Sequence, residues 1–206
     1  MSPTLQRLHR ITGIVIASFL LLHVTNHLFA LAGPATHIAV MKVFRRVYRF
    51  PPVEILLLAC VAFQVVSGLI LVFKKGFRKQ PAFVMAQVIS GLYLSFFLCF
   101  HVRAVLMGRY SWKVETDFYF AAGVANSYPG KLFFIPYYTL SLLAAFTHFA
   151  AVHYYKRRGH LAQITDEVAH AAADRRYKRE TLAIGIAGSV ITLLIMLALS
   201  GVLYPI

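Results

Sequence analysis

The sequence predicts an all-α integral membrane protein, with a single transmembrane domain over residues 1–206 that forms a bundle of five helices. Two observations predict this fold class. Hydrophobic residues make up 59% of the chain and charged residues only 14%, whereas soluble domains average about 45–50% and about 25%. Five apolar stretches also approach or exceed the ~20 residues that a helix needs to cross a hydrocarbon core. The net charge of +14 does not indicate nucleic-acid binding, because the basic residues do not replace apolar ones.

The predicted spans are each too long and too continuous to be strands, and lipid accepts only helices or closed barrels. The first span is not a cleavable signal peptide, since it contains histidines and lacks a small-residue cleavage site. Gly33 and Pro34 end this span, and Pro51 and Pro52 begin the next with backbone angles suited to a first helical turn. The five spans cover residues 11–31, 53–73, 82–107, 132–155 and 181–203.

The distribution of basic residues predicts the orientation of the bundle. With five spans, the N-terminus shares one side of the membrane with the second-to-third and fourth-to-fifth connections. This side holds 13 of the 21 Lys and Arg residues, and the other side holds 8. We therefore expect the N-terminus in the cytoplasm and the C-terminus outside. The basic connection 156–180 is expected to be either a short helix lying on anionic lipid or a solvated linker.

Four of the nine histidines lie well inside the predicted spans. An ionisable residue inside a membrane helix is costly and usually has a partner. For a single histidine, an interhelical hydrogen bond is the ordinary explanation. Four histidines on three helices also indicate haem, because helical bundles commonly hold this cofactor in their core. The four residues are His23, His27, His101 and His148.

An internal repeat relates the first and third spans. Each contains Ile-Thr-Gly or Ile-Ser-Gly, followed by His-Val with the histidine ten residues after Gly13 or Gly91. Because both helices run in the same direction, His23 and His101 reach a similar depth and can bind one haem iron from opposite sides. His27 lies one turn beyond His23 and is the alternative ligand or a contact at the propionate side. Chance similarity between two apolar helices is the competing explanation.

The second and fourth spans do not offer a second matched pair of ligands. His148 lies on the fourth span, but the second span has no histidine and its best counterpart is Gln64. Glutamine is a poor haem ligand, whereas a hydrogen bond between glutamine and histidine across two helices is ordinary. The sequence therefore favours one haem b over two, with His23 and His101 as the axial ligands of its iron.

The order of the motifs along the chain resembles that in the membrane cytochrome b subunit of succinate dehydrogenases and fumarate reductases, in its single-polypeptide five-helix form. The similarity extends over roughly the first 155 residues. Gln64 departs from the pattern of the two-haem members, which use a histidine there. The pieces that carry the resemblance are Arg7-Leu8-His9-Arg10-Ile11-Thr12-Gly13, His23 with Asn26, Val53-Glu54-Ile55 through Gln64 and Gly68, His101, and His148-Phe149.

The resemblance implies a multi-pass protein of the bacterial inner membrane that passes electrons between quinone and a partner oxidoreductase. It also implies flavoprotein and iron–sulfur subunits docked on the cytoplasmic side, which would carry any dicarboxylate chemistry. His23 and His101 match the family's outer haem ligands, and His148 matches one ligand of the inner haem.

The resemblance also suggests residues for quinone and haem contacts. Glu54 is the carboxylate inside a span, and its alternative role is an ion pair with Arg46 or Arg49. The candidates for proton exchange with quinone are Glu54, His37 and His9, and those for binding haem propionates are Arg10 and Arg103. The second functional hypothesis is a stand-alone haem-binding or lipid-organising membrane protein without a dehydrogenase partner.

Overall fold

The computed structural model describes residues 3–75 and 80–206, and these two ranges contain helices and no strand. Five of the helices, α1, α3, α4, α6 and α7, are long and apolar enough to cross a membrane. This confirms the predicted all-α bundle of five spans. The elements are α1 (Pro3–Leu28), the short 3-10 helix η1 (Phe29–Ala32), α2 (Pro34–Tyr48), α3 (Pro51–Lys75), α4 (Ala82–Tyr110), α5 (Phe118–Asn126), α6 (Lys131–Leu161) and α7 (Glu167–Leu199).

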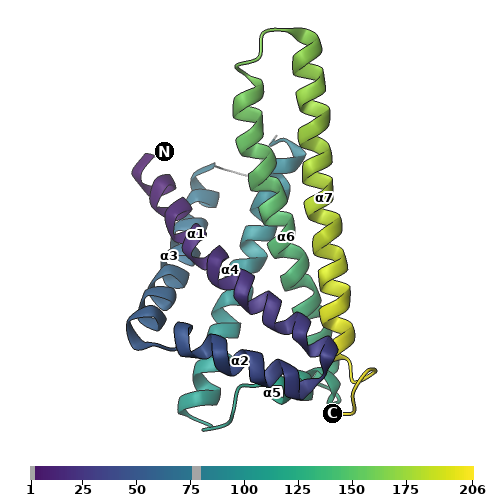
Figure 1. The fold of residues 1–206 in the computed structure, drawn as a ribbon. Coiled ribbons are helices and arrows are strands. Elements are labelled where there is room, and N and C mark those ends of the chain that lie inside the picture. The colour runs from purple at the N-terminus through teal and green to yellow at the C-terminus, as the bar shows by residue number, and fades with distance from the viewer. Residues whose placement is uncertain (1–2, 76–79) are drawn as a thin grey trace.

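The five long helices form a ring. Helix α3 packs on α1 and α4, and α6 packs on α4 and α7, while α7 returns to α1 and η1. The shorter helices α2 and α5 lie across one end of the ring, where the C-terminus also lies (Figure 1). We call this end the α2–α5 side. The opposite end, where α6 and α7 are joined, is the hairpin side.

The turn from α1 into α2 places α2 across the end of the ring. Gly33 adopts a φ of 106°, which favours glycine because it has no Cβ. Pro34 then begins α2 at a position where its missing N–H is not needed. The hydroxyl of Tyr204 donates to the carbonyl of Leu31 at 2.8 Å, which ties the C-terminal segment to the same turn.

The connection 156–180 is neither of the two structures that the sequence predicts, a short helix on the lipid surface or a solvated linker. Helix α6 continues to Leu161 and α7 begins at Glu167, so most of this segment extends two spanning helices. Together they form a hairpin that projects beyond the other helices (Figure 1). The segment is therefore neither a separate helix lying on lipid nor a linker. The Asp166 side chain caps α7 by accepting a hydrogen bond from the Ala169 backbone N–H at 2.7 Å.

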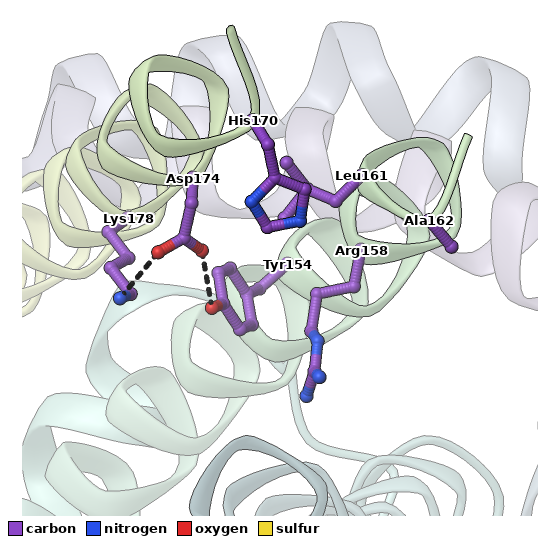
Figure 2. A pocket seen from close by; sticks show the side chains of 7 residues that line it. All are labelled: Tyr154, Arg158, Leu161, Ala162, His170, Asp174 and Lys178. Atoms are coloured by element: carbon purple, nitrogen blue, oxygen red, sulfur yellow. Dashed lines mark hydrogen bonds and ion pairs between the residues drawn. The ribbon is translucent and has the colours of Figure 1, made fainter. Parts of the chain in front are cut away.

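The carboxylates of the hairpin hold its two helices together. Asp174 on α7 accepts a hydrogen bond from the Tyr154 hydroxyl of α6 at 3.2 Å and pairs with Lys178 at 2.6 Å (Figure 2). Glu180 lies 2.9 Å from the imidazole of His153 on α6. The hairpin encloses a shallow hollow lined by Tyr154, Arg158, Leu161, Ala162, His170, Asp174 and Lys178.

The spans are longer than the sequence predicts, because polar residues at their ends continue the helices. Helix α1 begins at Pro3 rather than at residue 11, and α7 begins at Glu167 rather than at residue 181. Two basic residues counted toward the predicted orientation, Arg78 and Lys79, lie outside the described residues.

Candidate functional site

His23 on α1 and His101 on α4 face each other across the interior of the ring. Their ring centroids are 6.0 Å apart and their planes are inclined by 70°. Among the closely packed helix pairs, α1 packs on α3, and α4 packs on α3 and α6, so the two imidazoles bridge a gap between helices that are not close neighbours. Neither imidazole forms a hydrogen bond with a described residue.

Each imidazole stacks on a phenylalanine one turn earlier in its own helix. The Phe19 and His23 rings are 5.4 Å apart with planes 23° from parallel, and the Phe97 and His101 rings are 4.9 Å apart with planes 16° from parallel. Both phenylalanines lie six residues after the glycine of the internal repeat. The repeat in the sequence therefore includes an aromatic position that the sequence analysis missed.

Two more histidines continue this arrangement toward the α2–α5 side. The His27 ring lies 4.8 Å from His23 and 5.2 Å from His37 on α2. The Asn26 amide donates to Nε2 of His37 at 3.0 Å. We call His23, His27, His37 and His101 the histidine site.

His37 is buried, with an exposed fraction of 2%. Burial lowers the pKa of His37 to about 4, and smaller opposing effects come from Asp117, which raises it, and Arg45, which lowers it. His37 is therefore neutral near pH 7. In this state it carries a single ring proton, so one of its nitrogens donates and the other accepts.

The spacing of His23 and His101 meets one requirement for binding a haem iron. A metal–imidazole bond is about 2 Å long, so two imidazoles on opposite sides of one metal ion have ring centres roughly 6 Å apart. His23 and His101 meet this spacing, and no hydrogen bond to a described residue competes for their ring nitrogens. The described ranges contain no group of three or more His, Cys, Asp or Glu side chains placed to hold a metal ion. A haem needs only two protein ligands, because the porphyrin supplies the others.

Unpaired polar atoms next to the imidazole pair also fit a bound group. Four buried side-chain atoms in the described residues lack a hydrogen-bond partner, and two of these atoms belong to histidines of the histidine site. Such an atom costs about 1–3 kcal/mol when nothing satisfies it. The atoms are Asn26 Oδ1, His27 Nδ1, His37 Nδ1 and Arg45 Nε.

Arg45 is a residue of this site that the sequence analysis missed. Its Nη2 donates to the Thr116 carbonyl at 2.8 Å and to the Thr116 hydroxyl at 3.1 Å, and only 13% of the side chain is exposed. His37, Met41 and Arg45 are spaced four residues apart, which places them on one face of α2. His37 and Met41 are buried there. This spacing is the signal that could have identified Arg45.

Glu54 lies in an ion pair at the α2–α5 side. It is bound by Arg109 of α4, rather than by Arg46 or Arg49 as the sequence suggested. Arg49 instead donates to the Thr116 hydroxyl at 2.9 Å. The two arginines predicted to bind haem propionates, Arg10 and Arg103, are both exposed.

On the hairpin side, Gln64 of α3 binds to α1. Its amide donates to the His9 carbonyl at 2.6 Å and to the Thr12 hydroxyl at 3.2 Å. A Cβ at Gly13 would lie 2.7 Å from Nε2 of Gln64, so a larger residue at position 13 would displace this amide. The imidazole of His9 lies 2.7 Å from the hydroxyl of Ser67 on α3. Gln64 thus joins two neighbouring helices, and its hydrogen bonds go to α1 rather than to His148.

His148 of α6 makes the equivalent contact with α4. Its Nδ1 lies 3.1 Å from the Gln87 carbonyl and 3.2 Å from the Ser90 hydroxyl. A Cβ at Gly91 would lie 3.2 Å from Cε1 of His148. The two halves of the repeat therefore share one packing pattern, and His148 is not part of the histidine site. We call Thr12, Gly13, Gln64, Ser90, Gly91 and His148 the polar belt.

Comparisons with protein-family models, with curated proteins and with solved structures each gave no match to this chain. The function is therefore inferred from the contacts and chemistry of these two polar regions, together with the motifs in the sequence.

Proposed function

We propose that this protein is a membrane-bound b-type cytochrome that carries one haem b and passes electrons between a membrane quinone and a partner oxidoreductase. The observation that carries the proposal is the pair of facing imidazoles, His23 and His101, with ring centroids 6.0 Å apart. The haem supplies one-electron redox chemistry. The protein supplies two axial nitrogens and a buried environment, which together set the potential.

The residues around the ligands orient them before haem binds. A ligating histidine is usually held by a hydrogen bond from its second ring nitrogen. Here the stacked rings of Phe19 and Phe97 restrict His23 and His101 instead. Because α1 and α4 are not close neighbours, a flat cofactor between the two imidazoles does not have to separate a packed helix pair.

The resemblance of the sequence to the cytochrome b family supports quinone as the electron-transfer partner in the membrane. Glu54 and His37 on the α2–α5 side, and His9 on the hairpin side, are the groups proposed to exchange protons with it. Glu54 is held by its ion pair with Arg109, and a carboxylate oxygen at this position can accept a hydrogen bond from a quinol hydroxyl. His37 is buried and neutral, so it can also take part in hydrogen bonding.

We place the partner subunits, a flavoprotein and an iron–sulfur protein, on the hairpin side. The sequence assigns 13 of its 21 basic residues to this side, which the positive-inside rule makes cytoplasmic in a bacterial inner membrane. His23 lies ten residues, about 15 Å of helix, from Gly13 in the polar belt. A haem at His23 therefore sits toward the side opposite the partner, and a mobile quinone would carry electrons across that distance.

A stand-alone haem-binding protein is the second candidate function. The observation that favours it is Gln64, which is occupied by hydrogen bonds to α1 and provides no imidazole for a second haem near the hairpin side. Without that haem, a direct electron path to a docked subunit is interrupted.

Haem content is the first test of the proposal. The protein is expressed in a haem-sufficient host and purified in mild detergent, and haem is counted as the pyridine haemochrome. We expect one haem b per chain, with the low-spin spectrum of two axial imidazoles in the reduced-minus-oxidised difference. No haem would contradict the proposal, and two haems per chain would contradict the interpretation of Gln64.

Reaction with quinol separates the two candidate functions. The oxidised protein is placed in liposomes with a water-insoluble quinol, and the absorbance of the reduced haem is followed. Reduction within seconds supports an electron-transfer role. A haem that is bound but is not reduced by quinol supports the stand-alone haem-binding protein instead.

A further inference from the structure

Four unpaired polar atoms gather at one end of the histidine site. The Asn26 amide is bonded to His37, the His27 and His37 rings are 5.2 Å apart, and Arg45 is close enough to affect the charge state of His37. Each of these residues keeps one buried polar atom without a partner among the described residues. Buried polar atoms are almost always paired in folded proteins, so a cluster of four implies a group that is bound there.

Two of the four unpaired atoms, on His37 and Arg45, are hydrogen-bond donors, and Asn26 Oδ1 is an acceptor. Because Nδ2 of Asn26 donates to Nε2 of His37, the single proton of the neutral imidazole lies on Nδ1, which is the unpaired atom. Nε of Arg45 is a donor in every state of the side chain. The Nη2 group of Arg45 is held by Thr116, which fixes the side chain. The cluster therefore offers at least two fixed donors to an acceptor.

Two arginines, Arg45 and Arg49, lie close together at this point. Arg45 and Arg49 bind the same threonine, and burial together with Arg45 and Arg109 lowers the pKa of Arg49. The carboxylate nearest to Arg45 is Glu115, at 3.6 Å, but 82% of its side chain is exposed. The carboxylate of Asp117 accepts a hydrogen bond from the first turn of α5. The contacts of Arg45 with Glu115 and Thr116 use its terminal nitrogens and leave Nε without a partner.

The position of the cluster next to the histidine pair indicates which acceptor group binds there. His27 links it to the iron ligand His23, with ring centroids 4.8 Å apart. His37 is 2% exposed and Asn26 is 5% exposed, so these two members of the cluster are buried. The cluster therefore suits a small acceptor group carried by something already bound at the imidazole pair. A haem held by His23 and His101 carries two such groups, its carboxylate side chains.

We propose that Arg45 and His37 bind a carboxylate of the haem held between His23 and His101, so that the haem lies with its carboxylates toward the α2–α5 side. This inference rests on the proposed function, because it requires haem at the histidine site. Arginine is well suited to a buried carboxylate, and charge-assisted hydrogen bonds are the stronger kind. Arg45 and His37 thus replace the exposed Arg10 and Arg103 as the residues that orient the cofactor.

The binding of a carboxylate by Arg45 affects two measurable properties of the haem. A cation near the porphyrin favours the reduced state, so removing it shifts the midpoint potential downward. Losing a hydrogen bond to a charged group, worth about 1.5–3 kcal/mol, weakens haem binding by roughly tenfold or more.

Arg45→Gln tests the inference, with Arg46→Gln as its control. Arg46 is the next residue on the same helix and is exposed, so both variants lose one positive charge from α2. In Arg45→Gln we expect a lower midpoint potential, a shifted resonance Raman band of the haem carboxylates, and about tenfold faster transfer of haem to an apoprotein acceptor. Arg46→Gln is expected to match the unchanged protein in all three measurements.

The haem content of the unchanged protein is measured first. If it is zero, the proposed function fails, and the inference fails with it. If haem is present but Arg45→Gln and Arg46→Gln do not differ, the cluster is filled by water only and the inference alone is overturned.

If Arg45→Gln does not fold, a second experiment on the unchanged protein tests whether the haem carboxylates are bound. The unchanged apoprotein is then reconstituted with haem or with haem dimethyl ester, whose esterified carboxyl groups carry no negative charge and so form weaker hydrogen bonds with Arg45. We expect the ester to bind about tenfold more weakly. Equal affinity for the two haems would overturn the inference.

Discussion

The two polar regions of this bundle differ in how their hydrogen-bonding groups are used. In the polar belt, Gln64 and His148 each contact two polar groups of a neighbouring helix at 3.2 Å or less. In the histidine site, His23 and His101 make no hydrogen bond to a described residue, and His27 and His37 each keep a buried ring nitrogen unpaired. Helix packing explains the polar belt, whereas the histidine site keeps buried polar atoms that no described residue pairs.

The same repeat therefore serves two purposes along one pair of helices. At the glycine, a small residue lets a side chain of the neighbouring helix approach α1 or α4 closely. Ten residues further on, the histidine makes no hydrogen bond to a described residue and lies near the other histidine of the repeat. A histidine in a membrane helix is thus not by itself evidence for a cofactor, and its hydrogen bonds distinguish a packing role from a ligand role.

Removing one histidine from each region is expected to give the largest difference. His101→Ala removes one of the two proposed haem ligands, so we expect complete loss of the low-spin haem spectrum. His148→Ala removes only contacts with Gln87 and Ser90, so the haem spectrum should remain recognisable. Both proteins are compared by pyridine haemochrome after purification. Haem that is kept in His101→Ala and lost in His148→Ala would show that the ligands are assigned to the wrong region.

Changing Gln64 to histidine is expected to make the polar belt more like the histidine site. Residue 64 lies against Gly13 as His148 lies against Gly91, so Gln64→His would supply an imidazole equivalent to that of His148. We expect the haem content to rise from one per chain toward two. Gln64→Leu, which adds no ligand, serves as the control and should keep one haem. If Gln64→His also keeps one haem, Gln64 is not what limits the number of haems.

The sequence was sufficient to predict the spans and the relation between His23 and His101, because both depend on local patterns. Hydrophobic length predicts a membrane helix, and the shared spacing from glycine to histidine predicts equal depth in two helices. The ends of the helices were predicted less well. Charged residues from Glu167 to Glu180 continue α7, and a hydropathy pattern assigns such residues to a connection.

The contacts of Arg45 and Glu54 could not be predicted, because they depend on how distant segments meet. Arg45 binds Thr116, which is 71 residues away in the chain, and Glu54 binds Arg109, which is 55 residues away. Proximity in the sequence suggested Arg46 and Arg49 as partners of Glu54, but the ring brings the end of α4 next to the start of α3 instead.

Acid should affect the histidine site more than the rest of the molecule. Burial lowers the pKa of His37 to about 4, below its unfolded value of about 6.5. As pH falls, the unfolded chain takes up this proton first, so the contribution to stability is present above about pH 6.5 and is lost toward pH 4. The loss is at most roughly 3 kcal/mol.

Thermal unfolding of the haem-free protein in detergent at pH 7 and pH 4.5 measures this effect. His37→Gln should lose less stability on acidification than the unchanged protein, since it cannot take up the proton. His160→Gln, at an exposed position, is the control and should behave like the unchanged protein. The same loss of stability in all three proteins would mean that other groups dominate the acid sensitivity.

The smallest expected effect tests the close packing of the polar belt. In Gly13→Ala, the new Cβ would lie 2.7 Å from Nε2 of Gln64, whose amide is fixed by two hydrogen bonds to α1. Displacing that amide costs about 1–3 kcal/mol, which exceeds the gain of about 1 kcal/mol in helix propensity. Gly185→Ala, where the added Cβ meets nothing within 4 Å, gains the propensity alone and should unfold at a higher temperature.

Combining Gly13→Ala with Gln64→Ala separates the clash from the lost hydrogen bonds. If the contact between the two residues is the cause, the double variant is less destabilised than the sum of the single variants. If the double variant loses as much stability as the two single variants together, the destabilisation by Gly13→Ala has another cause on α1. In that case the glycine of the repeat would not be explained by Gln64, and the parallel with Gly91 and His148 would no longer account for both halves of the bundle.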